Sequence, residues 1–246
     1  MEIIFLGTNG WYDTRSGNTI CILIKTKNQY IVFDAGYGIS KLDRFVDGLN
    51  PIYLFLSHFH LDHICGLHVL NKFRFEQGIH IYGREGVSSV LNTIINTPFT
   101  VPLSNLPYKV DIHEIKLGRN KEPISFECLE LFHPNGCLGF RLYVEGKVIT
   151  YCSDTGKCKN LFKLARKADL LITECSLKPG ESDPNWPHLN PEDAIEIAKE
   201  AKAKKLALVH FDASKYISNE ERFIIADLET KFENLVIGID DFSLNL

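Results

Sequence analysis

Four side chains that can bind a metal ion fall within one short segment of this 246-residue chain: His58, His60, Asp62 and His63. The apolar residues 52–56 precede them and predict a buried strand that ends at this cluster. In extended backbone, residues two positions apart point to the same side, so His58 and His60 are expected to face one point. Asp62 and His63 belong to the turn that follows and can face a second point. Because imidazole and carboxylate groups are common ligands of Zn²⁺, the segment predicts a metal site.

Four further polar residues share one feature, because each follows an apolar run: His133, Asp154, Glu174 and His210. If these runs are neighbouring strands, the residues that follow them meet at one edge, where the sites of α/β proteins commonly lie. A capping or solvated role is the alternative for His133, Asp154 and His210.

The seven predicted metal ligands divide into two groups and one bridging residue. The first group is His58, His60 and His133, and the second is Asp62, His63 and His210. Three imidazoles suit Zn²⁺, the second group has mixed nitrogen and oxygen ligands, and the two oxygens of Asp154 can bridge both metals. Two metals roughly 3.5–4 Å apart can hold one water between them and lower its pKa. This ligand set predicts hydrolysis by a hydroxide that bridges the metals.

His188 lies in a Pro-rich loop, two residues before a predicted helix start. An imidazole that is protonated there near neutral pH suits a general acid for a leaving alkoxide, and Glu174 can orient it through the other ring nitrogen. An ordinary surface ion pair is the alternative for these two residues. We predict His188, Glu174 and Asp62 as the catalytic residues. Asp34 follows a buried strand and either accepts a hydrogen bond from a ligand His or caps the following turn.

Charge and apolar patterning limit the class of protein. The formal net charge is −4, whereas proteins that bind duplex DNA or folded RNA usually carry a basic excess. No apolar run approaches the roughly 18 residues of a membrane span, and the N-terminus lacks the basic region of a signal peptide. The seven cysteines form no CxxC pair and mostly lie in apolar runs, which favours reduced thiols. These features predict a cytoplasmic protein without membrane contact and disfavour nucleic acid as a partner.

The order of predicted elements indicates a mixed α/β fold. Short strands come first, strand and helix then alternate, and strands and a helix recur in the second half. A helix is predicted over 219–232, and the residues after it are predicted to form a strand. Residues 190–193 predict a helix start, with Asn as the N-cap, Pro at the first position and acids in the first turn. The Pro-rich segment 96–108 predicts a loop that lies over another surface, and it is a candidate contact in a homodimer. Because no linker interrupts the chain, residues 1–246 are predicted to form a single domain.

The metal-binding motifs resemble those of the metallo-β-lactamase superfamily over nearly the whole chain: His58-x-His60-x-Asp62-His63, then His133, Asp154 and His210. The resemblance implies a four-layer αββα sandwich, with two mixed sheets inside and helices outside, and a dinuclear centre bridged by Asp154. It favours two Zn²⁺ ions, because His60 stands where flavodiiron proteins carry Glu, although Mn²⁺ or Fe can occupy the same ligands. True β-lactamases carry Cys at the position of Asp154, which argues against an antibiotic-degrading enzyme.

Three downstream segments resemble the phosphodiesterase branch of this superfamily, which includes the tRNA-processing RNase Z and small phosphodiesterases: 170–174, 188–194 and 208–216. The resemblance implies that Glu174 and His188 are paired for proton transfer. RNase Z carries a long tRNA-gripping arm between the positions that match His133 and Asp154. Here only residues 134–153 lie between them, and they predict a hairpin. The resemblance therefore favours a small phosphodiester over tRNA.

The predicted function is that of a dinuclear metal-dependent phosphodiesterase that cleaves a cyclic nucleotide, a nucleotide or an alkyl phosphodiester. The alternatives are a thioesterase of glyoxalase II type, a tRNA 3′-end endoribonuclease, and a non-catalytic sensor that binds metal and nucleotide. A thiolate leaves without an acid, so Glu174 and His188 argue against the thioesterase. Arg15 and Lys215 either contact a phosphate or are solvated surface charges. Cys65 is expected to be a small buried residue and not a ligand.

Overall fold

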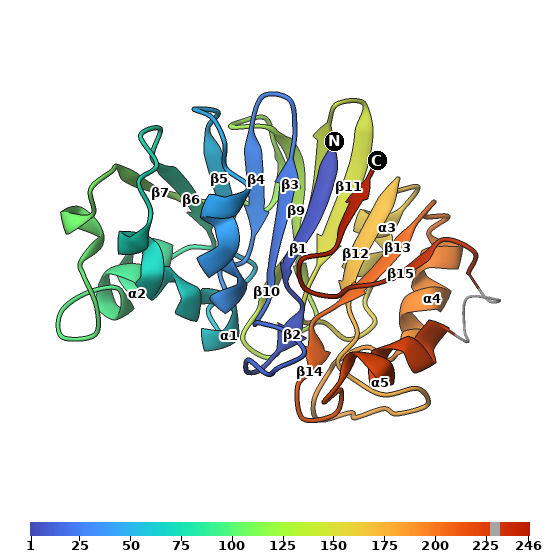
Figure 1. Ribbon diagram of the computed structural model, residues 1–246. Coiled ribbons are helices and arrows are strands. Elements are labelled where there is room, and N and C mark those ends of the chain that lie inside the picture. The colour runs from blue at the N-terminus through green and yellow to red at the C-terminus, as the bar shows by residue number, and fades with distance from the viewer. Residues whose placement is uncertain (227–231) are drawn as a thin grey trace.

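Two seven-stranded sheets pack against each other in the computed structural model, which describes residues 1–226 and 232–246 (Figure 1). The first sheet contains, in spatial order, β16 (Ser243–Asn245), β1 (Glu2–Gly7), β3 (Cys21–Lys25), β4 (Tyr30–Phe33), β5 (Ile52–Phe55), β6 (Ile79–Gly83) and β7 (Val110–Glu114). The strands from β16 to β4 pair antiparallel, and those from β4 to β7 pair parallel. The first sheet is therefore mixed, as predicted.

The second sheet is also mixed, with antiparallel pairs on one side and parallel pairs on the other. Its strands, in spatial order, are β15 (Leu235–Ile237), β13 (Leu206–Val209), β12 (Leu170–Glu174), β11 (Lys147–Cys152), β10 (Cys137–Val144), β9 (Ser125–Leu131) and β8 (Gly118–Asn120). Strands β10 and β11 are the predicted hairpin between His133 and Asp154, joined by a short turn with Gly146 at φ 73°. This hairpin continues the sheet, so these residues build no separate arm.

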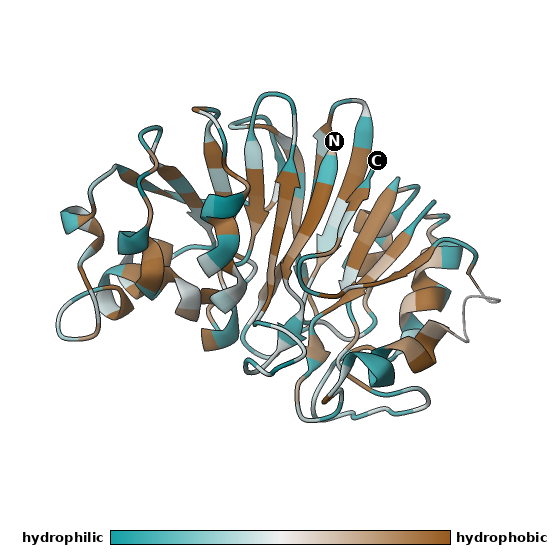
Figure 2. Ribbon diagram, viewed as in Figure 1, coloured by the Kyte–Doolittle hydropathy of each residue, from teal (hydrophilic) through white to brown (hydrophobic). Residues whose placement is uncertain are grey.

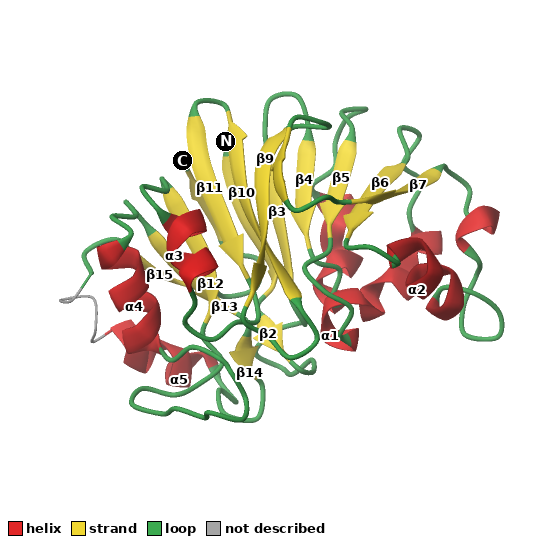
Figure 3. Ribbon diagram, turned by 180° about the vertical axis from the view of Figure 1, so that it is seen from behind, coloured by secondary structure: helices red, strands yellow, loops and turns green. Residues whose placement is uncertain are grey.

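Helices cover the outer face of each sheet (Figure 3). Those on the first sheet are η1 (Tyr37–Arg44), α1 (Leu61–Ile64), η2 (Cys65–Lys72), α2 (Val87–Ile94) and η3 (Leu103–Asn105); those on the second are α3 (Lys159–Ala165), α4 (Pro191–Glu200) and α5 (Asn219–Phe223). The predicted start of α4 is confirmed, because the Asn190 side chain accepts a hydrogen bond of 2.8 Å from the backbone N of Asp193. Residues 227–231 of the predicted helix 219–232 lie outside the described part of the chain. Among the described residues, every helix is too short or too polar to cross a membrane.

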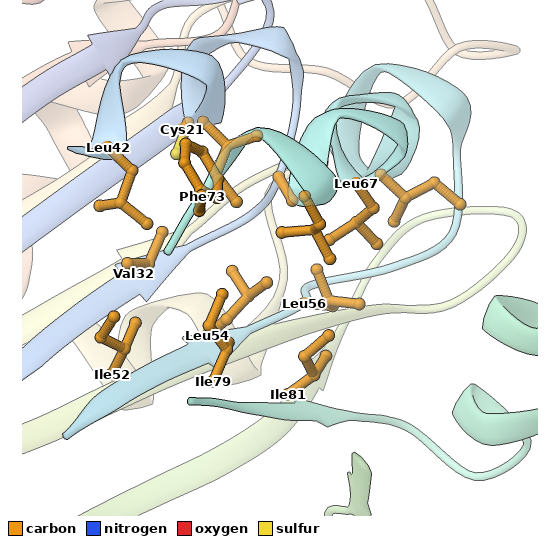
Figure 4. Close-up of a cluster of buried hydrophobic side chains, with 14 of the residues drawn as sticks. Cys21, Val32, Leu42, Ile52, Leu54, Leu56, Leu67, Phe73, Ile79 and Ile81 are labelled. Atoms are coloured by element: carbon orange, nitrogen blue, oxygen red, sulfur yellow. The ribbon is translucent and has the colours of Figure 1, made fainter. Parts of the chain in front are cut away.

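Three apolar interfaces separate four layers. The first lies between the first sheet and its helices, where Val32, Leu54 and Ile81 meet Leu42 and Leu67 (Figure 4). The second lies between the two sheets, and the third between the second sheet and α3 and α4. Strands covered on both faces are apolar along most of their length, as their brown colour in Figure 2 shows. The αββα sandwich implied by the sequence motifs is therefore confirmed.

A third, two-stranded sheet joins the two large sheets at one edge. Strand β2 (Asn9–Gly10) follows β1, strand β14 (Phe211–Asp212) follows β13, and the two pair parallel. They lie at the lower edge in Figure 1, near α1, whereas the two chain termini lie at the opposite edge. Loops from both sheets therefore come together at this lower edge.

Candidate metal centre

The seven residues predicted to bind metal come together at the edge marked by α1, β2 and β14. His58 and His60 follow β5, and Asp62 and His63 lie on α1; His133, Asp154 and His210 follow β9, β11 and β13. Their potential ligand atoms form two groups, and within each group all of these atoms lie within 4.8 Å of one another. The first group is His58, His60, His133 and Asp154, and the second is Asp62, His63 and His210. The tertiary structure thus forms the two groups that the sequence predicts.

The second group converges on a point between four side chains. Nε2 of His63 lies 3.0 Å from Nε2 of His210, and both nitrogens lie 3.2 Å from Oδ1 of Asp154. Oδ2 of Asp62 lies 3.3 Å from Nε2 of His210. Two imidazole nitrogens and two carboxylate oxygens therefore face one another at distances that suit a shared cation.

The first group surrounds the other oxygen of Asp154. Oδ2 of Asp154 lies 3.8 Å from Nε2 of His58 and 4.0 Å from Nε2 of His133. The His60 ring completes the group, with its centroid 4.5 Å from that of His58 and 4.9 Å from that of His133. The two oxygens of Asp154 thus face different groups, which is the arrangement that a bridging carboxylate requires.

The protonation states of His58 and Asp154 also fit metal ions. Nε2 of His58 is buried and has no hydrogen-bond partner, a state that is costly unless the nitrogen binds something. Burial lowers the pKa of His58, which keeps its lone pair free. Burial also raises the pKa of Asp154, but the neighbouring His210 and His63 lower it more, so the carboxylate stays charged. The donor set of imidazole and carboxylate groups therefore fits two divalent metal ions.

Hydrogen bonds hold the candidate ligands in place from behind. Nδ1 of His63 donates to Oδ2 of Asp34 at 2.8 Å, and the same oxygen accepts from Ser57 Oγ at 2.8 Å and from Tyr151 Oη at 2.6 Å. Asp34 is fully buried, so the structure supports the acceptor role predicted for it and not the role of a turn cap. Orientation of a ligand His by a carboxylate at its other nitrogen is common in metal sites.

Two more candidate ligands are oriented by residues that the sequence did not single out. Asn135 Nδ2 donates to Nε2 of His60 at 2.9 Å, which fixes the orientation of this ring. The hydroxyl of Ser176 lies 3.1 Å from Nδ1 of His210. Amide and hydroxyl side chains are frequent on any surface, so no sequence signal distinguishes these two.

The end of β2 provides room for the His210 ring and a hydrogen bond to Asp62, and the sequence alone predicted neither. A Cβ atom on Gly10 would lie 2.5 to 2.9 Å from three ring atoms of His210, so only glycine fits beneath this imidazole. The next residue, Trp11, donates its backbone N–H to Oδ2 of Asp62 at 2.7 Å. Both contacts join residues far apart in the chain and follow only from the fold.

His188 and Glu174 form a buried pair beside the two groups. Nδ1 of His188 lies 2.6 Å from Oε1 of Glu174, and Glu174 also accepts from the backbone N of Thr155 at 2.7 Å and of Ser176 at 3.1 Å. Burial lowers the pKa of His188, but the charge and the hydrogen bond of Glu174 outweigh it and raise the pKa to about 9. Because both side chains are buried, the alternative of an exposed surface ion pair is wrong.

One cavity of about 630 Å³ contains the exposed side of this centre. It is lined by Gly10, Trp11, His60, Leu61, Asp62, Asp154, Ser176, Trp186, His188, His210 and Asp212. Four of the candidate ligands, the His188 imidazole and the two tryptophans therefore line one space that is large enough for a small organic substrate.

The remaining predicted residues lie elsewhere. Lys215 Nζ lies 2.6 Å from Oε2 of Glu181, which fits a surface charge better than a phosphate contact. Arg15 is exposed, and within the described ranges it is not among the residues that line the cavity. Cys65 lies outside both metal groups of the described residues, with its Sγ 3.9 Å from Thr19 Oγ1. The 96–108 segment packs on η2 of its own chain, where Tyr108 Oη donates to the carbonyl of Leu70 at 2.7 Å.

The four-layer sandwich with His and Asp groups at one edge defines a metal-dependent hydrolase of the metallo-β-lactamase type. The chain belongs to the β-lactamase superfamily, because residues 29–211 match the family model described as a β-lactamase superfamily domain. The match covers the segment from β4 to β14 and includes all seven candidate ligands.

Curated and solved relatives point to the same branch as the sequence motifs. Ribonuclease Z of Pyrococcus abyssi is 28% identical over 85% of this chain and 86% of its own length. Among solved structures, the metallo-β-lactamase fold protein YhfI from Bacillus subtilis has a TM-score of 0.79 at 21% identity and covers 99% of this chain and 98% of its own. The short form of human tRNase Z has a TM-score of 0.77 at 22% identity and covers 100% and 99%. These relatives fit the phosphodiesterase branch.

The alignment with the Pyrococcus protein spans 271 positions, although it covers only 85% of these 246 residues. It therefore includes positions at which only the relative has residues. This difference agrees with the short hairpin of β10 and β11 in the present chain.

Proposed function

We propose that this protein is a dinuclear metal-dependent phosphodiesterase that acts on a small phosphodiester in the cytoplasm, with Zn²⁺ as the expected metal. The observation that carries the proposal is the buried pair of Glu174 and His188, because the His188 imidazole lines the same cavity as members of both metal groups. An alkoxide is a poor leaving group and needs a proton, whereas many other hydrolytic leaving groups do not. A proton donor beside the metal ligands therefore favours a phosphodiester.

Each side chain has a defined part in this proposal. Two metals would be held by the two groups of candidate ligands: His58, His60 and His133 with Asp154, and Asp62, His63 and His210. The bound metals would supply a water of lowered pKa and neutralise charge on the phosphate oxygens. Glu174 holds Nδ1 of His188, so Nε2 is the nitrogen that gives a proton to the leaving oxygen. The backbone N–H of Trp11 keeps Asp62 oriented toward His210.

A phosphodiester panel with metal analysis tests the proposal. The purified protein with two bound metals per chain is expected to hydrolyse bis(p-nitrophenyl) phosphate. If this protein leaves the phosphodiester intact across a range of pH and added Zn²⁺, Mn²⁺ or Fe²⁺, the proposal fails. The same panel compares the metals by activity per metal bound.

RNA is the second candidate substrate, because several curated relatives are named as ribonucleases. Nucleic acid is therefore kept as a candidate substrate, although the composition of the chain disfavours it. The hairpin of β10 and β11 in place of an arm, and the net charge of −4, favour a smaller substrate. The endoribonuclease would be favoured if the protein cleaved a precursor tRNA at the 3′ end of the mature tRNA sequence, and did so faster than it cleaved small diesters.

A thioesterase and a non-catalytic sensor can each be recognised by a simple test. Turnover of S-lactoylglutathione in preference to phosphodiesters would select the thioesterase. A nucleotide that co-purifies without being hydrolysed would select the sensor. A homodimer that uses the 96–108 segment stays a prediction, to be measured by light scattering.

A further inference from the structure

Both tryptophans of the chain line the cavity of the candidate metal centre, and both are exposed there. Trp11 is 67% exposed in the loop after β2, and Trp186 is 52% exposed in the loop before α4. A single exposed aromatic residue is common, but two from distant segments at one cavity mark a contact surface. Indole rings at such a place offer large, rigid faces to a ligand.

The two tryptophans lie near different parts of the centre. The ring centroid of Trp186 lies 5.4 Å from that of His188, the proposed proton donor. The backbone of Trp11 is bonded to Asp62, which belongs to the second metal group. A phosphodiester between the metals and His188 would therefore have one indole near its leaving group and another near the second metal group.

The charge of the cavity limits what else the substrate carries. Its lining, as far as the chain is described, contains neither Lys nor Arg. The nearby Lys215 and Lys178 are each paired with a carboxylate, Glu181 at 2.6 Å and Glu221 at 2.9 Å. The described lining of the cavity therefore provides no Lys or Arg to bind a further phosphate group. Its exposed apolar surface suits an uncharged planar group.

We propose that Trp11 and Trp186 form an aromatic subsite that stacks a nucleobase, so that the substrate is a nucleoside phosphodiester and not an alkyl phosphodiester. This inference rests on the phosphodiesterase function proposed above. Stacking of one base on one aromatic side chain typically changes affinity by about 5- to 150-fold. An alkyl diester has no planar group and therefore gains no affinity from stacking.

Intrinsic fluorescence tests the subsite without turnover, because Trp11 and Trp186 are its only tryptophan reporters. Adenosine 5′-monophosphate added to the metal-loaded protein should quench the emission saturably. Ribose 5-phosphate, which has the phosphate but no base, should not. The variants Trp11→Phe and Trp186→Phe each retain one tryptophan and should each show quenching. Equal quenching by both ligands, or by neither, would overturn the proposal.

Kinetics provide a second measurement. For a dinucleoside monophosphate, Trp11→Ala and Trp186→Ala should raise KM by about 5- to 150-fold. The preference for this substrate over methyl p-nitrophenyl phosphate should fall by a similar factor, and Trp186→Phe should restore most of it. Phe99→Ala is the matched control, because Phe99 is 74% exposed and lies on the 96–108 segment, away from the cavity lining. A preference that survives both alanine variants would contradict the subsite.

The outcomes separate this inference from the proposed function. Base-dependent quenching without hydrolysis of any diester supports the subsite and refutes the phosphodiesterase. Hydrolysis of diesters with no difference between base-containing and alkyl substrates supports the phosphodiesterase and refutes the subsite.

Discussion

Nδ1 of His188 lies 2.6 Å from Oε1 of Glu174, and the carboxylate of Glu174 is completely buried. The carboxylate can only accept, so the imidazole donates from Nδ1 and leaves Nε2 for a ligand in the cavity. The charge of Glu174 also keeps the imidazole protonated, with a pKa of about 9. This one contact therefore fixes both the orientation and the charge of the proposed proton donor.

Replacing His188 should abolish proton donation but leave metal binding intact. We expect His188→Ala to lower kcat toward a diester with an alkoxide leaving group by about 10²- to 10⁴-fold, with two metals still bound. Steady-state kinetics and metal analysis on the same sample measure both quantities. His80→Ala on β6 is a control outside the centre and should change neither. A His188→Ala protein that loses its metals would show that the residue acts in metal binding.

The pH dependence should reflect the charge of Glu174. In the wild type, His188 is protonated below its pKa of about 9, so activity should fall as the pH rises through that value. Glu174→Gln removes the negative charge that raises this pKa, while burial, which lowers it, remains. The alkaline limit of kcat should therefore move to lower pH.

The control for this variant is Glu196→Gln, which removes an exposed carboxylate that pairs with Lys157 on the surface. Its pH profile should match that of the wild type. An unchanged alkaline limit in Glu174→Gln would exclude His188 as the titrating acid.

Asp154 should be needed for both metals, because its two oxygens face the two groups separately. We expect Asp154→Asn to reduce the metal content below two per chain and to lower kcat/KM by at least about 100-fold, as loss of a metal function typically does. Asp212→Asn is the matched control, since Asp212 lines the same cavity but belongs to neither group. Full metal content in Asp154→Asn would contradict the bridging role.

Gly10 should be intolerant of any side chain. A Cβ atom there would lie 2.5 to 2.9 Å from the His210 ring, so Gly10→Ala must displace that imidazole from the second group. We expect metal loss and reduced activity, with the fold retained by circular dichroism. Gly48→Ala is the control, because the nearest atom to its Cβ would be Tyr30 Oη at 3.7 Å. Normal metal binding in Gly10→Ala would mean that His210 is not held as described.

The strands and the ligand types were predictable from sequence because their signals are local. Apolar runs such as 52–56 end where polar residues begin, and His58, His60, Asp62 and His63 are adjacent in the chain. The start of α4 was predictable for the same reason, since Asn190 and Pro191 act on their immediate neighbours. The 3₁₀ hydrogen bonds of η1 were not predictable in this way, because the apolar spacing of Ile39 and Leu42 indicates a helix but does not resolve its hydrogen-bond spacing.

The sequence by itself determined the kinds of ligand, their order, and the family they resemble, because these depend on residue identity and short spacing. Only the tertiary structure decided which residues surround the ligands. It places Asp34 behind His63, Gly10 beneath His210, and both tryptophans at one cavity. These contacts join segments from different strands of two sheets, up to 200 residues apart in the case of Gly10 and His210. Such proximity arises from packing of the sheets and leaves no pattern in the local sequence.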